Sequence, residues 1–283
     1  MQSRNALRRD ELIKILPVII LYRQALTACR SYNTLLRGYD GKIFVFDNSP
    51  EAAMLPDDPR IIYYHAPENP GISTGYNFAA DYALKNEFSW LLLLDQDSEF
   101  TFPPAVYIDA VCKNPEIGLF APAMKTSQGI PMSPVNLQTL FPTAEEMTPG
   151  RYPLKSYVPV NSGSLVSTEL FWKCGGYNEK VFLDHSDYDF MERLAMVTEN
   201  FILIDGTVVQ DYSGDEVDPE RIRKRFILFL KSARNCVWRT LFRKLKMDFF
   251  VFCRALIVGK QLNMRLKILR AWFKIFVLRR DEA

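Results

Sequence analysis

A run of four leucines that ends in two aspartates constrains this chain more than any other feature. The run, Leu91 to Leu94, is too apolar for a solvated loop and too short to span a membrane. It is typical of a strand buried on both faces, as in a parallel sheet. Asp95 and Asp97 follow at once, where ligands bind in open α/β sheets. Two carboxylates there could hold Mg²⁺ or Mn²⁺ together with a diphosphate, although Asp is also an ordinary turn residue.

Strands and helices alternate around this run, which predicts βαβ units and a mostly parallel sheet. The expected strands lie at residues 13–21, 42–46, 61–64, 90–94, 201–204 and 207–209, and the expected helices at residues 25–36, 73–85 and 168–174. Ser73 or Thr74 should cap the second helix. The inner face of that helix should carry Tyr76, Ala79, Ala80, Ala83 and Leu84. The fold class is therefore α/β.

Polar residues recur where successive strands end. Asp47 follows the second strand, Asn69 the third, and Asp95 with Asp97 the fourth. Each alone is explained by turn chemistry. A doubly wound sheet brings such ends to one edge, so together they predict a nucleotide pocket.

A second acidic cluster contains Asp184, Asp187 and Asp189 and runs into Arg193. Carboxylates are favoured at a helix N-terminus, which is the structural explanation. Three so close together also repel one another, and a cation or a substrate would relieve that repulsion. One of them could act as a general base on an acceptor hydroxyl. The neighbouring His185 is more simply explained as structural.

Residues 126–159 are rich in Pro, Thr, Ser and Gly and show little periodicity. We expect a long loop there, of the kind that often forms a lid or binds a ligand.

The charge is strongly divided along the chain. Residues 221–283 carry 18 Lys and Arg against 3 acids, whereas residues 1–220 carry 17 against 30. The sequence thus predicts an acidic domain over 1–220 and a basic helical region over 221–283. In the last segment, apolar residues recur at steps of three and four: Leu262, Leu266, Leu269, Phe273 and Phe276.

Basic residues lie between these apolar positions. The pattern is typical of a helix on an anionic membrane surface. A helix packed on the domain with a solvated basic face is the alternative. Nucleic-acid binding is disfavoured because no motif for it accompanies the charge.

The five cysteines are scattered without paired spacing, which indicates reduced thiols in a cytosolic compartment. Neither a signal peptide nor a stretch long enough to span a bilayer is apparent. We therefore expect a cytoplasmic protein, peripheral on the inner face of the membrane.

With these motifs placed, residues 13–240 resemble the family 2 glycosyltransferases of the GT-A fold, especially rhamnosyltransferase-like enzymes of bacterial surface polysaccharides. Asp95-Gln96-Asp97-Ser98 is the most diagnostic motif. The other matching motifs, in the family's order, are Phe46 to Ser49, Glu68 to Gly71 with Asn77, Asn161 to Leu165, Gly175 to Glu179, and Phe182 to Asp187 with Asp189 and Arg193.

The resemblance implies roles for these residues. Asp47 would contact the nucleobase, and the donor-nucleotide wall would contain Asn69, Gly71 and Asn77. Asp95 and Asp97 would bind the donor diphosphate and its Mg²⁺ or Mn²⁺, with Asp97 the more direct ligand. Asp187 would be the catalytic base, supported by Asp184, Asp189 and Arg193. Many members have a histidine as a third metal ligand, where this chain has Gln210 and Asp211, so Asp211 becomes the candidate.

The family implies an inverting transfer from a nucleoside diphosphate sugar, plausibly dTDP-rhamnose, to a lipid-linked oligosaccharide of O-antigen or capsule. A nucleotidyltransferase would use a similar sheet, but it would need a glycine-rich basic loop, and residues 18–24 contain no glycine. A degenerate transferase acting as a membrane scaffold is the third alternative.

Overall fold

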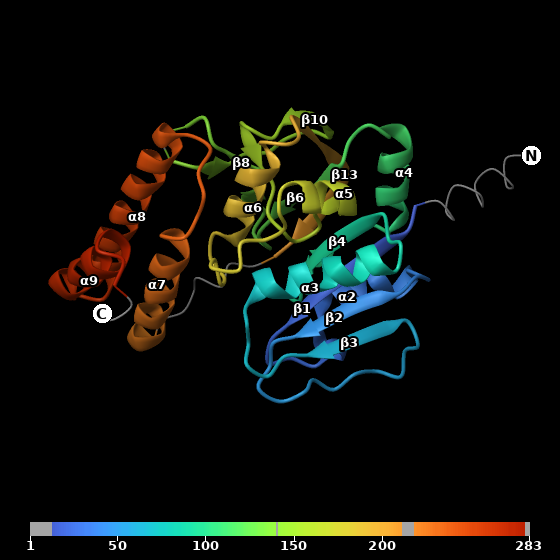
Figure 1. Ribbon diagram of the computed structural model, residues 1–283, viewed down its shortest axis with the longest axis horizontal. Helices are drawn as coiled ribbons and strands as arrows, with labels where there is room; N and C mark the ends of the chain where they lie inside the picture. The colour runs from blue at the N-terminus through green and yellow to red at the C-terminus, as the bar shows by residue number, and fades with distance from the viewer. Residues whose placement is uncertain (1–12, 140, 211–217, 281–283) are drawn as a thin grey trace, which may run out of the picture.

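A ten-stranded mixed sheet forms the centre of the protein (Figure 1). The computed structural model describes residues 13–139, 141–210 and 218–280. The strand order is β10-β13-β6-β12-β4-β1-β2-β3, with β5 paired to β13 and β7 paired to β6. The leucine run is β4 (Trp90–Asp95), and its four leucines are almost fully buried, as predicted.

The half of the sheet before β4 is parallel throughout. β4 pairs with β1 (Ile15–Leu21), β1 with β2 (Ile43–Asp47), and β2 with β3 (Ile61–His65). On the other side of β4, the short strand β12 (Leu165–Ser167) runs antiparallel to both of its neighbours. The remaining strands of the sheet are β5 (Glu99–Phe100), β6 (Leu119–Lys125), β7 (Pro131–Ser133), β10 (Gly150–Pro153) and β13 (Asn200–Val209).

Register brings the predicted strand ends to one edge. Leu21 at the end of β1 lies opposite Asp47, and Ile20 lies opposite Asp95. Asp47 in turn lies opposite His65 at the end of β3. The carboxyl ends of these four strands therefore share one edge of the sheet.

Each face of the sheet has its own apolar core. Leu91 and Leu93 point to the face covered by α3 (Ile72–Lys85), α5 (Thr168–Lys173) and α6 (Ser186–Leu194). Leu92 and Leu94 point to the opposite face, which is covered by α4 (Ala105–Lys113) and residues 26–36. The alternation follows from the two-residue period of a strand.

Two expectations about the early helices were wrong. Residues 25–36 do not form one helix but three short pieces, η1 (Leu26–Ala28), α2 (Arg30–Thr34) and η2 (Leu36–Gly38). Helix α3 is not capped by Ser73 or Thr74, because its N-cap is Gly71, at φ 94°. The inner face of α3 is confirmed at Tyr76, Ala79, Ala80 and Ala83, but Leu84 is 61% exposed.

The predicted loop over residues 126–159 is interrupted by five short strands. It contributes β7 and β10 to the main sheet, and its other strands are β8 (Val135–Asn136) and β9 (Thr143–Ala144). With β11 (Tyr157–Val158) these last two form a small antiparallel sheet of their own. Strands of two to four residues leave no readable alternation in the sequence.

The basic region folds as three helices with a core of their own. Helices α7 (Pro219–Ala233), α8 (Leu241–Gln261) and α9 (Arg265–Trp272) lie together beyond α6, and a π-helical turn (Phe273–Val277) follows (Figure 1). The predicted apolar face divides: Leu269 packs on this core, whereas Leu266 and Phe273 are exposed. None of the helices that the structure describes is long and apolar enough to cross a bilayer.

Candidate active site

Asp95 stands at the end of β4 with its backbone held on both sides. Its N–H donates to Ser162 Oγ over 3.1 Å, and its carbonyl oxygen accepts from Ser31 Oγ at 2.7 Å. The buried Tyr76 hydroxyl lies 3.4 Å from Asp95 Oδ1. Residues distant in sequence therefore hold the Asp95 backbone in place, and Tyr76 contacts its carboxylate.

Gln210 holds Asp97 in the loop that follows β4. Its Nε2 donates to Asp97 Oδ1 over 2.9 Å, and its Oε1 accepts from Ser98 Oγ at 2.8 Å. Ser98 Oγ also lies 2.6 Å from Ser162 Oγ. Gln210 thus occupies the position where the family resemblance predicts a histidine, and its amide binds the side chain of Asp97.

Asp187 lies in the first turn of α6, two residues after the N-cap His185, whose backbone is left-handed at φ 68°. Its Oδ1 accepts from the N–H of Tyr188 at 2.8 Å. Burial lowers the pKa of His185 to about 4, and the ring packs 4.7 Å from that of Phe229. These contacts agree with a structural histidine beside the proposed base.

The three carboxylates Asp95, Asp97 and Asp187 form one electrostatic cluster. Burial, followed by the charges of Asp97 and Asp187, raises the pKa of Asp95 to about 7. Burial raises the pKa of Asp187 to about 6 and also raises that of Asp97. Uncompensated negative charge at a strand edge is costly, and a bound cation would relieve it.

The residues present fit a divalent cation that shares its ligands with a substrate. Mg²⁺ is commonly held by one or two carboxylates plus substrate phosphates, and Asp95 and Asp97 supply the two. In the described ranges, no three His, Cys, Asp or Glu side chains gather as a complete metal site. Asp211, the candidate third ligand, lies outside the described residues.

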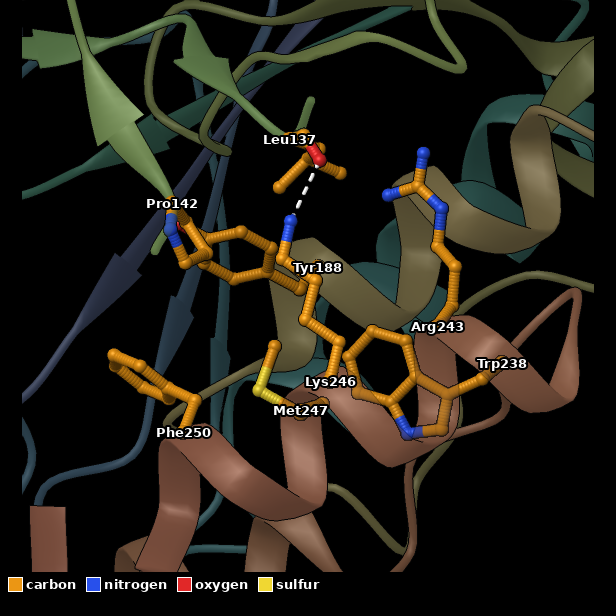
Figure 2. Close-up of a pocket in the computed structure, with 8 residues that line it drawn as sticks. All are labelled: Leu137, Pro142, Tyr188, Trp238, Arg243, Lys246, Met247 and Phe250. Carbon is orange, nitrogen blue, oxygen red and sulfur yellow. Dashed lines mark hydrogen bonds between the residues drawn. The ribbon is translucent and has the colours of Figure 1, made fainter. Parts of the chain in front are cut away.

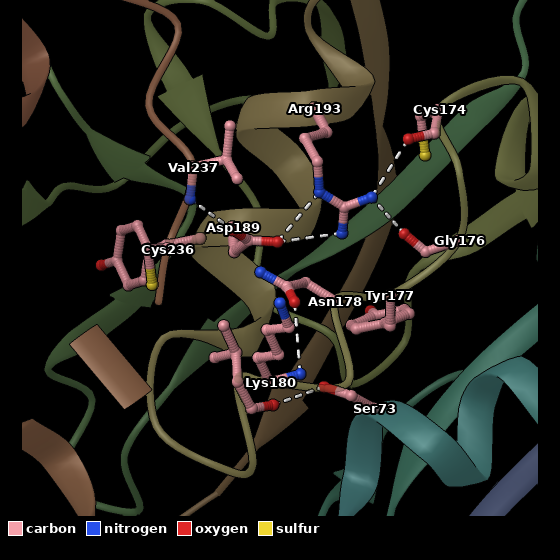
Figure 3. A network of polar contacts seen from close by, with 12 residues as sticks. Ser73, Cys174, Gly176, Tyr177, Asn178, Lys180, Asp189, Arg193, Cys236 and Val237 are labelled. Carbon is pink, nitrogen blue, oxygen red and sulfur yellow. Dashed lines mark hydrogen bonds and ion pairs between the residues drawn. The ribbon is translucent and has the colours of Figure 1, made fainter. Parts of the chain in front are cut away.

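Asp189 and Arg193 join α6 to two other segments (Figure 3). Arg193 forms an ion pair with Asp189 at 2.9 Å and donates to the carbonyl oxygens of Cys174 and Gly176. The other Asp189 oxygen accepts from the N–H of Val237 at 2.7 Å. Asp189 is fully buried. The pair therefore positions the helix that carries Asp187.

Asp184 faces the helical region. It lies 3.3 Å from Arg225 on α7, and one of its oxygens, Oδ2, is buried without a hydrogen-bond partner. Burial raises the pKa of Asp184, and Arg225 and Arg254 oppose that shift. Asp184 is thus a second link, beside the contact of His185 with Phe229, between the segment before Asp187 and α7.

Asn69 and Gly71 form the turn before α3. Both have positive φ, 48° and 94°. A Cβ on Gly71 would approach the carbonyl oxygen of Phe182 to 2.7 Å, so only glycine lets this turn meet the segment before Asp187. The turn and the acidic segment are therefore neighbours.

Asn77, expected in the donor wall, is engaged elsewhere. Its amide donates to the carbonyl of Tyr177 and to Glu179, each at 2.9 Å, and accepts from the N–H of Tyr177 at 2.7 Å. A Cβ on Gly176 would come within 2.7 Å of Asn77 Oδ1. Both amide hydrogens are used, so Asn77 positions the loop 175–179 and has no donor left for a nucleotide.

Asp47 is fully buried and organises the segment that follows β2. Its oxygens accept from the N–H of Ser49 at 2.9 Å, the N–H of Ala53 at 2.8 Å and the hydroxyl of Tyr63 at 2.6 Å. Burial raises its pKa, but these hydrogen bonds outweigh burial and lower it overall. Asp47 is therefore an anion whose oxygens already have protein partners.

Sequence reasoning missed several residues that the structure adds to the site. Tyr76 was assigned only to the core, although its hydroxyl meets Asp95. Tyr177 is near the acidic groups: burial raises the pKa of its hydroxyl, and the charges of Asp187 and Asp95 raise it further. Ser162 stood within a matching motif but had no assigned role. Gln210 was named only as the neighbour of Asp211, where the family has a histidine, and its bonds to Asp97 and Ser98 were not predicted.

The sequence is similar to that of the dTDP-rhamnosyl transferase RfbF of Shigella flexneri, with 26% identity over 189 residues. The match covers 63% of this chain and 62% of the relative. No protein-family model matches the chain. The chain thus matches less than two thirds of that relative's length.

The fold is similar to that of two solved glycosyltransferase structures. One is GalNAc-T7 with UDP, GalNAc and Mn²⁺, at a TM-score of 0.57 and 11% identity, covering 94% of this chain and 56% of that one. The other is residues 1–349 of Staphylococcus aureus TarS with UDP-GlcNAc, at 0.53 and 14%, covering 92% and 79%. The predicted GT-A fold and the family 2-like resemblance are confirmed.

Proposed function

We propose that this family 2-like glycosyltransferase moves a sugar from a nucleoside diphosphate donor to an acceptor hydroxyl with inversion. The proximity of Asp187, on α6, to Asp95 and Asp97, at the end of β4, carries the proposal. The similarity to a dTDP-rhamnosyl transferase favours dTDP-rhamnose as the donor, and the fold neighbour solved with UDP-GlcNAc supports a nucleotide sugar.

Asp187 is the proposed base. Its carboxylate accepts the proton of the acceptor hydroxyl, and the acceptor oxygen attacks the anomeric carbon as the bond to the diphosphate breaks. Attack from the face opposite the diphosphate inverts the configuration. A pKa near 6 leaves Asp187 ionised at neutral pH yet more basic than an ordinary aspartate.

Asp95 and Asp97 are the proposed ligands of Mg²⁺ or Mn²⁺, which when bound supplies positive charge to the departing diphosphate. Gln210 and Ser162 fix these two residues in place. Asn69 and Gly71 would contact the donor through the turn before α3. Asp47 would act on the nucleobase through the loop it organises.

The proposed acceptor is a lipid-linked saccharide, of the kind used for O-antigen or capsule, at the inner face of the membrane. Residues 249–280 contain eight Lys and Arg and no acid. Exposed apolar side chains accompany them, with Phe242, Leu245, Phe249 and Leu256 along α8, and Leu266 and Phe273 on the last segment. Apolar groups beside unopposed positive charge fit an anionic lipid surface.

The test is nucleoside diphosphate release from a panel of nucleotide sugars, with Mg²⁺ or Mn²⁺ and membrane lipid extract. We expect release from one donor, lost at least a hundredfold in Asp97→Ala and Asp187→Asn. Asp109→Asn, an exposed aspartate on α4, is the matched control and should keep full activity. Nucleotide binding without turnover of any donor would favour a scaffold, and equal activity of Asp187→Asn would exclude that residue as the base.

A further inference from the structure

The small cavity between α6 and α8 is a packed joint and not a binding site (Figure 2). Leu137, Tyr188 and Phe250 belong to its walls, and its free volume of about 20 Å³ holds about one water molecule. Lys246 donates to the carbonyl oxygen of Leu137 at 2.8 Å, which ties α8 to the segment after β8. The cations around this cavity therefore hold protein segments together, and two arginines without such a task lie at the carboxyl edge of the sheet.

The two residues that follow β1 have their backbone held from both neighbouring strands. The N–H of Tyr22 donates to Gln96 Oε1 over 2.8 Å, and Gln96 Nε2 donates to the carbonyl oxygen of Tyr22 over 3.3 Å. The N–H of Arg23 donates to Ser49 Oγ over 2.7 Å. Gln96 belongs to the loop after β4, and Ser49 belongs to the loop after β2. Tyr22 and Arg23 therefore have a fixed place at the carboxyl edge of the sheet, between these two loops.

This fixed backbone presents two exposed side chains. Tyr22 is 42% exposed, and the guanidinium group of Arg23 lies 5.2 Å from the centre of its ring. Arg23 is exposed as well, and its backbone is left-handed at φ 53°. Non-glycine residues held in this conformation cluster at active sites and ligand clamps, where the surrounding contacts enforce it. Core packing does not explain the position of Arg23, because its side chain faces solvent.

A second arginine lies beside the same loop after β4. The N–H of Arg30 donates to the carbonyl oxygen of Gln96 at 2.8 Å, which fixes Arg30 next to Asp97. Burial raises the pKa of Asp97, and the positive charge of Arg30 opposes that shift. Neither Arg23 nor Arg30 has an ion pair or a side-chain hydrogen bond to the residues that the structure describes. Both guanidinium groups are therefore open to a ligand.

The charge of the site calls for cations at this place. Asp95, Asp97 and Asp187 lie close enough for the charges of the other two to raise the pKa of Asp95. The diphosphate of a donor would bring further negative charge to the same cluster, more than one divalent cation neutralises. Arginine suits this task, because its planar guanidinium group donates paired hydrogen bonds to phosphate oxygens and does not lose its charge.

We propose that Arg23 and Arg30 bind the diphosphate of the donor. The order of the strands supports this pairing, because β1, which leads into Arg23, lies between β2 and β4. A nucleotide whose base lies at the loop that Asp47 organises passes Arg23 on its way to Asp97. Arg30 then stands where the diphosphate ends. This inference rests on the proposed function, in which a nucleoside diphosphate sugar is the donor.

The experiment is a calorimetric titration of the full chain with dTDP and, in parallel, with UDP, with Mg²⁺ present. Arg23→Gln and Arg30→Gln should each weaken the binding of the tighter nucleotide about tenfold, the usual loss for one hydrogen bond to a charged group. Arg37→Gln is the matched control, because Arg37 is exposed in η2, the next helical piece after α2, and it should bind like the wild type.

Two further measurements separate contact with the diphosphate from damage to the fold. Arg23→Lys and Arg30→Lys should recover part of the lost affinity, because lysine keeps the positive charge and gives up the paired hydrogen bonds. All four variants should unfold at the urea concentration of the wild type, because both side chains are exposed. Normal binding by either Gln variant, or no binding of either nucleotide by the wild type, would overturn the assignment.

The same titration separates this site from the proposed function. Binding of the expected pattern in a chain that turns over no nucleotide sugar would refute the transfer and leave the site standing. Turnover of a donor by a wild type whose Gln variants bind normally would refute the site and leave the transfer standing.

Discussion

Gln210 donates a hydrogen bond to Asp97 across 2.9 Å, joining the end of β13 to the loop after β4. Where the resembling family has a histidine that would contact the cation directly, this chain has an amide that contacts Asp97, a proposed ligand of that cation. Residues that orient metal ligands commonly affect affinity by one or two orders of magnitude.

Gln210→Ala should therefore raise the Mn²⁺ concentration needed for half-maximal activity about tenfold, while saturating Mn²⁺ restores most of the turnover. Activity titrated against Mn²⁺ measures this. Gln261→Ala, at the exposed end of α8, is the control. An unchanged Mn²⁺ requirement would show that Gln210 only shapes the loop.

The rate should depend on the protonation of Asp187. Its pKa of about 6 means that the carboxylate is mostly protonated below that pH and cannot accept a proton. We expect kcat/KM to rise about tenfold per pH unit below pH 6 and to level off above it. A limb centred near pH 4 would indicate an unperturbed carboxylate as the base.

Stability without added cation should fall as pH rises from about 4 to 7. The folded state binds a proton at Asp95 more tightly than the unfolded state does, so ionisation through this range favours unfolding. Asp95→Asn should remove this loss and raise the free energy of unfolding by about 2 kcal/mol at pH 8.

Urea denaturation of both proteins at pH 5 and pH 8 measures the difference. His185 has a lowered pKa and destabilises the fold in the opposite direction, below about pH 6.5. Its contribution is common to both proteins and cancels. Equal effects of Asp95→Asn at the two pH values would contradict the assignment of the raised pKa.

Glu192→Gln should be among the most destabilising substitutions in the chain. Its carboxylate is 1% exposed and compensates Arg239 and Arg243, which would lose their anionic partner. Breaking one side of such a pair costs about 3–5 kcal/mol. Urea denaturation should show this loss of unfolding free energy. Glu146→Gln, at an exposed position, is the control and should be as stable as the wild type. A loss below about 1 kcal/mol in Glu192→Gln would mean that water replaces the carboxylate.

The exposed apolar residues of the last segment should support membrane binding. The double variant Leu266→Ser with Phe273→Ser should float with anionic vesicles at about a tenth of the wild-type amount. Leu84→Ser, an equally exposed leucine on α3, provides the comparison. If the double variant floats with the vesicles as fully as Leu84→Ser does, the positive charges alone would account for membrane binding.

Sequence patterns predicted the strand edge because its signals are local. A run of leucines such as Leu91 to Leu94 is stable in a strand that is buried on both faces. Because Asp95 is charged, it must lie where that strand ends. The helix at 25–36 failed because tertiary contacts replace helical ones. Arg30 donates its N–H to Gln96, and Ser31 donates to Asp95, so the segment adapts to the loop after β4.

The roles of amides were the least predictable part of the site. Asn77 and Gln210 both matched positions that suggested contact with a ligand, yet each binds protein groups about 100 residues away. An amide offers donors and an acceptor to any neighbour, so its sequence position cannot say which neighbour it meets. The positions of Asp95 and Asp97 were more predictable, because they follow directly from the end of a buried strand.

The contacts of α6 change how the chain can be divided. The composition changes near residue 220, which invites cutting the protein there to separate catalysis from membrane binding. A fragment ending at that point would keep Glu192 buried without its arginines and Asp189 without Val237. Loss of activity in such a fragment would then reflect damage to α6, the helix that carries Asp187. Substitutions on the exposed faces of α8 and α9 would test the proposed membrane contact and leave α6 intact.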